Sequence, residues 1–286
     1  AHHRGRTAQR HGSEIRPAMR HALALLLGLC LALPAGAQEM RRLTDREDLL
    51  GWEGVGRLDM GGRGFCTATL IAPDVILTAA HCAYDRANGA PYEAAALTFR
   101  AGFSDGQAIA ERGIVQIAAH EGFDPRGPLT WSNVRHDVAL MRLEQPITVA
   151  EADPFALHDG PPRGGRVSLA SYGMGRSEAI SRQRECGILA AEEGIMVFDC
   201  EVTFGSSGSA VLTHEGGRGR VVSVISGMTE MNGKRVALGM ALPQVVADLK
   251  RHLRRDAPVP QAGIRRLRVG AGGGASGAKF VRPGGS

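Results

Sequence analysis

Short runs of apolar and β-branched residues recur about every ten residues through the middle of the chain. Residues that form turns, mainly Gly, Pro, Asn and Asp, separate these runs. The pattern predicts strands at residues 64–71, 75–79, 96–101, 113–119, 138–143, 167–172, 186–191, 195–200, 210–213, 220–226 and 236–241. Many short strands with turns between them are typical of an all-β sandwich or barrel.

One stretch near the end of the chain has the periodicity of a helix. Residues 243–253 place Val245, Val246, Leu249 and Leu253 on one face, which predicts a C-terminal amphipathic helix. Before this helix, a turn-rich linker separates two β halves of roughly a hundred residues each. The expected boundaries are about 50–150 for the first half, 144–165 for the linker and about 160–241 for the second half.

The N-terminal part of the chain has the organisation of a secretory signal. A short basic start at residues 19–21 precedes an apolar core at 22–33, and small residues with a proline follow at 34–37. The apolar run is too short to span a membrane comfortably. We therefore predict a signal peptide at 19–37 and export to the periplasm or the extracellular space. Residues 1–18 precede the expected start at Met19 and are predicted to be an upstream extension outside the fold.

The formal net charge of +5 is concentrated at the two ends of the chain. Residues 1–37 hold five Arg against one acidic residue, and residues 251–286 hold eight Lys and Arg against one. The stretch between them has 21 basic and 27 acidic residues. Because nucleic-acid binding requires a basic patch on a folded face, this distribution argues against a nucleic-acid partner. Residues 254–286, rich in Gly and Arg, are predicted to be a basic disordered tail.

The cysteines indicate disulfides. Removal of the signal would remove Cys30 and leave an even number, Cys66, Cys82, Cys186 and Cys200. An even number of cysteines in an exported chain favours disulfides. The spacings suggest two local loops, closed by Cys66–Cys82 and Cys186–Cys200. The same spacings do not match the paired ligands of a zinc site, so no metal is expected.

Three short stretches carry the residue types of a nucleophilic centre, each at the edge of a predicted strand. They are Leu77-Thr78-Ala79-Ala80-His81-Cys82, His136-Asp137-Val138-Ala139-Leu140-Met141-Arg142-Leu143 and Phe204-Gly205-Ser206-Ser207-Gly208-Ser209-Ala210-Val211. A serine hydroxyl becomes a good nucleophile when a base such as His takes its proton. A buried carboxylate orients the imidazole, and backbone N–H groups at a tight turn receive the developing oxyanion. His81, Asp137 and Ser207 are the candidates for these roles.

These stretches resemble motifs of the chymotrypsin/trypsin-like serine proteases. Thr78-Ala79-Ala80-His81-Cys82 is close to a signature of that family, and Cys66 has the spacing of its usual histidine-loop disulfide. The segment that begins at Asp137 is similar to the family's Asp-Ile-Ala-Leu-x-x-Leu, and the segment around Ser207 is similar to its serine loop. The resemblance covers roughly residues 55–253. It implies two antiparallel six-stranded β-barrels with the catalytic site in the cleft between them.

The resemblance also implies a role for each candidate residue. Ser207 would be the nucleophile, His81 the general base and then acid, and Asp137 the orienting carboxylate. The N–H groups of Gly205 and Ser207 would form the oxyanion hole. Ser226 falls where the family places a serine on the strand that pairs with the substrate backbone. The order His, Asp, Ser argues against an α/β-hydrolase, in which the serine comes first.

The serine loop departs from that of the digestive members, which reads Gly-Asp-Ser-Gly-Gly-Pro. Ser206 replaces the Asp, Ser209 the second Gly and Ala210 the Pro. In those members the Asp pairs with the N-terminus that activation frees, and Ser206 cannot make that ion pair. The pattern Gly-x-Ser-Gly-Ser looks more like the bacterial branch that includes glutamyl endopeptidases. Since the sequence contains no Ile-Val-Gly-Gly start, we hypothesise that the protein is active once its signal is removed.

Residues of the substrate pocket are harder to assign. Glu201 lies six residues before Ser207, where trypsin-like members keep an acid, and a buried carboxylate there would favour basic substrate side chains. Cys200, however, lies seven residues before Ser207, whereas the family's pocket cysteine lies four before it. A surface position for Glu201 therefore stays open. Met228 would narrow the site where the family often has Gly, and no preferred substrate residue follows.

The sequence thus predicts an exported, monomeric serine endopeptidase that hydrolyses protein or peptide substrates through an acyl-enzyme intermediate. Neither a cofactor nor a metal is expected, nor a membrane partner after the signal is removed. Two alternatives stay open. One is a non-catalytic binding protein on the same scaffold, although such proteins usually lack a member of the triad. The other is an esterase that uses the same triad.

Overall fold

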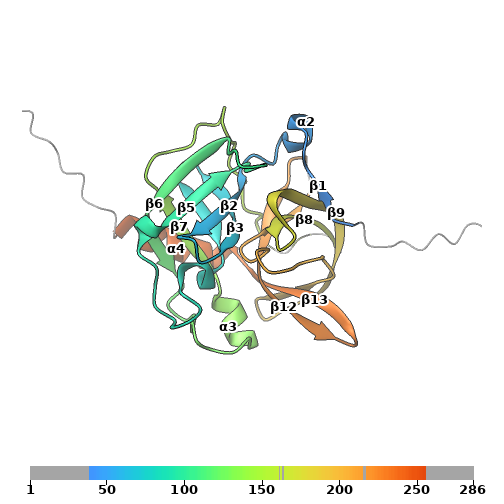
Figure 1. The fold of residues 1–286 in the computed structure, drawn as a ribbon. Helices are drawn as coiled ribbons and strands as arrows, with labels where there is room; N and C mark the ends of the chain where they lie inside the picture. Colours follow the sequence, from blue (N-terminus) through green and yellow to red (C-terminus); the bar gives the residue numbers. More distant parts are fainter. Residues whose placement is uncertain (1–38, 161, 163, 215–216, 256–286) are drawn as a thin grey trace, which may run out of the picture.

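The computed structural model describes residues 39–255, except 161, 163, 215 and 216. The predicted signal peptide, the segment upstream of it and the tail beyond residue 255 lie outside these residues. Within the described part, two β-barrels lie side by side (Figure 1). No helix in this part is both long and apolar enough to cross a membrane.

Barrel 1 is a closed sheet with the strand order β2-β3-β4-β7-β6-β5, and all its neighbouring strands are antiparallel. Large apolar side chains from these strands, such as Leu58, Leu70 and Phe99, are fully buried in its core. The strands are β2 (Val55–Met60), β3 (Phe65–Ala72), β4 (Val75–Thr78), β5 (Leu97–Ala101), β6 (Ala110–Ala119) and β7 (Ala139–Leu143).

Barrel 2 has the order β9-β10-β13-β12-β11-β8, and pairing of β8 with β9 closes it. A short edge strand, β1 (Arg41–Arg42), adds to the outside of β9. The strands of the barrel are β8 (Arg166–Gly173), β9 (Arg176–Glu192), β10 (Ile195–Phe198), β11 (Ala210–Thr213), β12 (Arg220–Met231) and β13 (Lys234–Ala241). The predicted fold class, two antiparallel six-stranded barrels, is therefore confirmed.

Several stretches of strand were not predicted from the apolar pattern, among them β2 and the first half of β9. β2 contains Gly, Arg and Asp, which are poor strand formers. Packing overrides this preference: a Cβ added at Gly56 would lie 2.3 Å from a ring carbon of Phe99, so only glycine fits there. The first half of β9 is polar, and its long antiparallel pairing with β8 keeps it extended.

The predicted C-terminal helix is confirmed as α4 (Pro243–Arg255), which extends two residues into the predicted tail. It follows the last strand of barrel 2 but packs against β6 and β7 of barrel 1 (Figure 1). Val246, Leu249 and Leu253 are its buried residues, as the periodicity predicts. Gln116 Nε2 donates a hydrogen bond to the Leu253 carbonyl over 3.1 Å. The helix therefore ties the end of barrel 2 to barrel 1.

Both predicted disulfides are present. Cys66 on β3 is bonded to Cys82, which lies in the turn after β4. Cys186 on β9 is bonded to Cys200, which follows β10. Each bond closes a local loop within one barrel, and its two cysteines are separated by 16 and 14 positions in sequence, respectively.

We expect the Cys66→Ala/Cys82→Ala variant to lose about 2–5 kcal/mol of unfolding free energy, because the open loop no longer restricts the unfolded chain. Urea denaturation followed by tryptophan fluorescence measures this change. The Cys186→Ala/Cys200→Ala variant is the matched control in barrel 2, and we expect a similar loss. An unchanged denaturation midpoint in either variant would contradict the expectation.

Candidate active site

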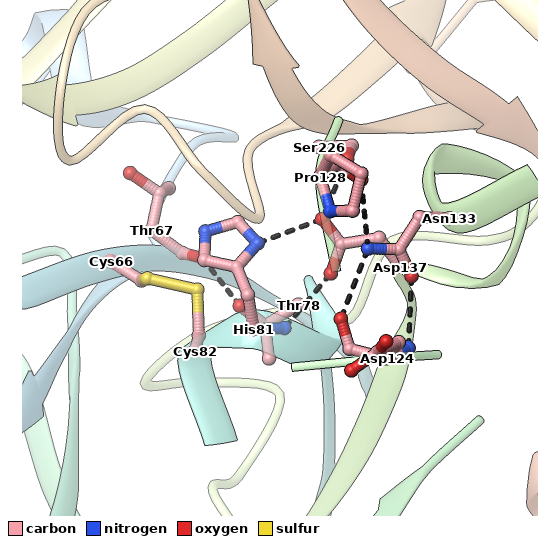
Figure 2. A network of polar contacts seen from close by, with 10 residues as sticks. All are labelled: Cys66, Thr67, Thr78, His81, Cys82, Asp124, Pro128, Asn133, Asp137 and Ser226. Atoms are coloured by element: carbon pink, nitrogen blue, oxygen red, sulfur yellow. Dashed lines mark hydrogen bonds and ion pairs between the residues drawn. A yellow bond between two sulfur atoms is a disulfide. The ribbon is translucent and has the colours of Figure 1, made fainter. Parts of the chain in front are cut away.

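His81 lies in a short 3-10 helix, η1 (Ala80–Ala83), directly after β4. The disulfide to Cys66 holds one side of this turn. On the other side, Thr78 Oγ1 donates a hydrogen bond to the Thr67 carbonyl over 2.9 Å. His81 Nδ1 lies 2.7 Å from Asp137 Oδ2, and Figure 2 shows the other ring nitrogen pointing away from that carboxylate.

Asp137 directly follows the short helix α3 (Trp131–His136), and its backbone N–H closes that helix. The residue is only 3% exposed. Its carboxylate accepts hydrogen bonds from the His81 N–H over 2.8 Å and from Ser226 Oγ over 2.6 Å, besides its contact with the imidazole (Figure 2). A buried carboxylate without partners is costly, so these donors stabilise it in the interior.

The same contacts decide which ring nitrogen of His81 carries the proton. An ionised carboxylate can only accept, so the Nδ1 that faces Asp137 must be the donor. In the neutral imidazole this leaves Nε2 with a free lone pair. The site therefore holds the histidine in the tautomer that can accept a proton on the side away from Asp137.

Asn133 fixes the loop that leads into α3. Its side-chain nitrogen donates to the carbonyl oxygens of Asp124 and Pro128 over 3.0 and 3.3 Å, and its oxygen accepts from the Asp124 N–H over 2.9 Å (Figure 2). The helix itself is capped by Thr130, whose hydroxyl accepts from the Asn133 N–H. This bonding gives the segment before Asp137 a defined shape.

Ser207 lies in the loop between β10 and β11, which belongs to barrel 2 but contacts barrel 1. The Ser207 carbonyl accepts a hydrogen bond from the Thr67 N–H over 2.9 Å. Thr67 Oγ1 donates to the Gly205 carbonyl over 2.9 Å and accepts from the Tyr172 N–H over 3.0 Å. Thr67 on β3 therefore sets the position of the serine loop relative to the histidine.

Two glycines give the serine loop its shape. Gly205 has φ +92° and Gly208 has φ +81°, a region that side chains with a Cβ rarely adopt. A Cβ on Gly205 would also lie 2.3 Å from a ring carbon of Phe65. Among the described residues, the N–H groups of Gly205 and Ser207 have no hydrogen-bond acceptor. These two donors are thus free to bind an oxygen atom.

One cavity of about 570 Å³ brings the candidates together. Its lining includes His81, Asp137, Ser207 and Ser226. The structure records no hydrogen bond between the His81 ring and the Ser207 hydroxyl, both of which belong to the described part. Such hydrogen bonds are often long in unliganded sites and tighten when substrate binds.

Of the two residues discussed for the substrate pocket, Met228 lines the cavity and Glu201 does not. Met228 lines the cavity, together with Val202 and the half-exposed ring of Phe204. Glu201 is exposed and is not among the lining residues, so the structure places it on the surface rather than in a buried acidic pocket. Its N–H donates to the Gln183 side chain, which turns the backbone at this point toward β9. Counting six residues back from Ser207 does not lead to a pocket residue, because the loop before Ser207 differs in spacing from that of trypsin-like members, as the position of Cys200 indicates.

Several residues of the site carry no motif. Thr67 lies in an apolar strand, Asn133 in a polar helix turn, and Arg176 at a hairpin, where it contacts Ser206 of the serine loop. Each acts through contacts with residues distant in sequence, which spacing does not reveal. Of the residues that support the site, Thr78 does belong to a recognisable motif, Thr78-Ala79-Ala80-His81-Cys82.

Cys66, His81 and Cys82 form a compact group of three residues that bind metals in other proteins. The two sulfur atoms are bonded to each other, however. Because zinc binds cysteine as the thiolate, this group offers only the imidazole as a ligand. The residues present do not fit a metal site.

Comparisons with known proteins point to one family. A family model described as a trypsin-like peptidase domain matches residues 66–224. Serine protease 56 of Homo sapiens is 34% identical over 126 residues, which is 43% of this chain and 19% of that protein. Serine protease 56 of Mus musculus is 31% identical over 150 residues, or 49% of this chain and 23% of that protein. The chain spans about a fifth of the length of these curated relatives.

Solved structures show the same fold. A Glu endopeptidase in complex with MPD superposes with a TM-score of 0.63 at 16% identity, covering 78% of this chain and all of that one. The thermostable serine protease AL20 from an extremophilic microorganism superposes with a TM-score of 0.58 at 18% identity, covering 72% of this chain and 98% of that one. At these identities the likeness concerns the fold alone.

We expect Gly208→Ala to destabilise the protein by about 3 kcal/mol or more, because the new methyl group overlaps backbone and strains the turn. Its Cβ would lie 2.1 Å from both the Thr67 carbonyl oxygen and Thr78 Oγ1. Gly233→Ala is the matched control: its φ is +73°, but nothing lies within 4 Å of the added Cβ. This control should lose only about 1–2 kcal/mol. Equal losses in thermal unfolding would show that the close approach at Gly208 is unimportant.

Proposed function

The chain belongs to the trypsin-like peptidase family, and we propose that it is a serine endopeptidase that cleaves peptide bonds through an acyl-enzyme intermediate. The observation that carries this proposal is the single cavity lined by His81, Asp137 and Ser207, beside two N–H groups with no acceptor among the described residues. Protein or peptide chains are the substrate class that follows from this chemistry.

In the first step, the Ser207 oxygen attacks the substrate carbonyl while His81 Nε2 takes the hydroxyl proton. The imidazolium that forms is stabilised by Asp137, which already accepts from the ring over 2.7 Å. The carbonyl oxygen becomes negative and accepts hydrogen bonds from the N–H groups of Gly205 and Ser207. Because these donors are preorganised by the glycine turn, they stabilise the transition state without further rearrangement.

His81 then gives its proton to the leaving amine, and the C–N bond breaks to leave an ester on Ser207. Water attacks this ester with His81 again as the base, and the acid product and free serine are released. Every proton transfer in this sequence goes to or from His81 Nε2, so the fixed tautomer of His81 serves both halves of the reaction. An ester substrate would pass through the same intermediate.

We further propose that the protein acts after export. Two disulfides in one small domain are typical of oxidising compartments. The signal-like pattern at residues 19–37 supports the same route. Mass spectrometry of the secreted chain would detect a start after residue 37 and the absence of free thiols.

Ser207→Ala and His81→Ala should each lower kcat/KM by about 10⁴-fold or more, because either change removes proton transfer to or from the nucleophile. Cleavage of fluorescently labelled casein and labelling by a fluorophosphonate probe measure this loss. His252→Ala, on α4, is the histidine control and should retain activity. Labelling that persists in Ser207→Ala would overturn the assignment of the nucleophile. No labelling of the folded wild type would favour a non-catalytic binding protein.

Ser226→Ala should lower kcat/KM by about 10- to 100-fold, since it removes one hydrogen bond to a buried charge, worth about 1.5–3 kcal/mol. Ser223→Ala is a close control on the same strand: its hydroxyl donates to the Met240 carbonyl over 2.8 Å and does not contact Asp137. This control should lose stability but little activity. If both variants kept full kcat/KM, the contact between Ser226 and Asp137 would have no role in the reaction.

A further inference from the structure

Ser206, the residue before Ser207, is the centre of a polar cluster under the serine loop. It is fully buried. Its hydroxyl accepts a hydrogen bond from the Thr203 N–H over 3.2 Å and donates to the Tyr172 carbonyl over 3.3 Å. In the digestive members an Asp at this position pairs with the freed N-terminus. The neutral Ser206 cannot form that ion pair, so other contacts must hold the loop.

Arg176 reaches this cluster from outside the loop. Its Nη1 donates to the Ser171 carbonyl over 2.6 Å, and its Nη2 donates to Ser171 Oγ and Ser206 Oγ over 2.9 and 3.0 Å. The planar guanidinium thus connects β8 to the serine loop with hydrogen bonds in a fixed geometry.

Close packing keeps the guanidinium in place. Arg176 begins β9 and pairs with Gly173 at the end of β8, with only two residues between them. A Cβ added at Gly173 would lie 2.8 Å from Arg176 Cζ, so glycine makes room for the charged group. In the same turn the Met174 N–H donates to the Phe204 carbonyl over 2.7 Å. Side chain and backbone of this turn both hold the serine loop.

The charge on Arg176 is not neutralised by an ion pair within the described residues. Burial lowers the pKa of Arg176 to about 10, and the charge of Glu201 opposes this effect. The guanidinium therefore stays protonated at neutral pH. The Arg176 guanidinium contacts the side chain of Ser206, which lies between Gly205 and Ser207 in sequence. Its positive charge is therefore near the N–H groups of both residues and favours negative charge on an oxygen atom that they bind.

The described N-terminal segment is held at a different place. Arg41 and Arg42 pair with Arg182 and Ser181 as the edge strand β1, and the Leu43 N–H continues this attachment along β9. In the part of the chain that the structure describes, the partners of the Ser206 hydroxyl come from β8, the first residue of β9 and the serine loop.

We propose that Arg176 is a positioning residue that holds the serine loop in its oxyanion-binding shape, in place of an ion pair with a freed N-terminus. This inference rests on the proposed peptidase function. It means that the loop is ordered by a residue inside the fold, so the site needs no ion pair from a freed N-terminus and no cleavage other than removal of the predicted signal at residues 19–37.

The test compares Arg176→Met with Arg176→Lys and with Arg182→Met, a control on the same strand whose side chain lies over the Trp52 ring. Arg176→Met should lower kcat by about 100-fold with KM changed less than about threefold, because oxyanion binding acts in the transition state. Arg182→Met should keep the kcat of the wild type. A peptide substrate selected from a cleavage library supplies both constants.

Arg176→Lys separates the charge from mere packing. It should restore most of the lost kcat at pH 7 and lose it again as pH rises through 8–10, where a partly buried lysine deprotonates. The wild type should show no such loss below about pH 10. A lysine variant as inactive as Arg176→Met at every pH would overturn the role of the charge.

Ser206→Ala covers the case in which Arg176→Met does not fold. It removes the acceptor of the Arg176 hydrogen bond, together with the contacts of the hydroxyl with the Thr203 N–H, the Tyr172 carbonyl and Ser171 Oγ. It should lower kcat by about tenfold or more, because the lost contact with Arg176 is a hydrogen bond to a charged group. In the double variant, Arg176→Met should cost less than it does alone, because the two residues act together. Fully additive losses, or an unchanged kcat in Ser206→Ala, would overturn the inference.

The two proposals fail in distinguishable ways. If the wild type neither cleaves casein nor reacts with a fluorophosphonate at Ser207, the peptidase function fails. If the wild type is active and Arg176→Met folds with unchanged kcat, only the role of Arg176 fails. A requirement for a second cleavage, after removal of the predicted signal, before activity appears would also overturn that role.

Discussion

A single buried carboxylate depends on both barrels. Asp137 at the end of barrel 1 receives the His81 N–H and imidazole from its own barrel and the Ser226 hydroxyl from barrel 2. Without the hydroxyl, the buried carboxylate would keep fewer hydrogen-bond donors. The energetic need to satisfy this group therefore favours the one docking of the barrels that also fixes the histidine tautomer. Stability and chemistry draw on the same contacts.

The serine loop of barrel 2 is also held by contacts from both barrels. Thr67, on a strand of barrel 1, bonds to the carbonyl groups of Gly205 and Ser207. Arg176 holds the same loop from within barrel 2 through Ser206. These contacts use the carbonyl groups of Gly205 and Ser207, and the N–H groups of the same two residues have no acceptor among the described residues. The turn can do this only with glycines at its strained positions.

The sequence was most informative where function resides in local patterns. Apolar periodicity predicted most strands and α4, and cysteine spacing predicted both disulfides. The residues around His81, Asp137 and Ser207 identified the candidate site because each motif is short and contiguous. Arg176 and Thr67 could not be found in this way, since one lies in a polar stretch and the other in an apolar strand. Their importance arises from partners 30 to 138 residues distant, as for Arg176–Ser206 and Thr67–Gly205. The expected pocket position of Glu201 was wrong because it relied on a residue count from Ser207, and such a count does not transfer to a loop with different spacing.

The attachment of α4 to barrel 1 has a consequence for the order in which the molecule is completed. During synthesis, the face of β6 and β7 that this helix covers stays bare until the last described residues of the chain have been made. By then all residues that line the candidate site have been made, but α4, which joins the end of barrel 2 to barrel 1, packs last. The burial of this face therefore makes the completion of barrel 1 depend on the synthesis of residues that come after barrel 2.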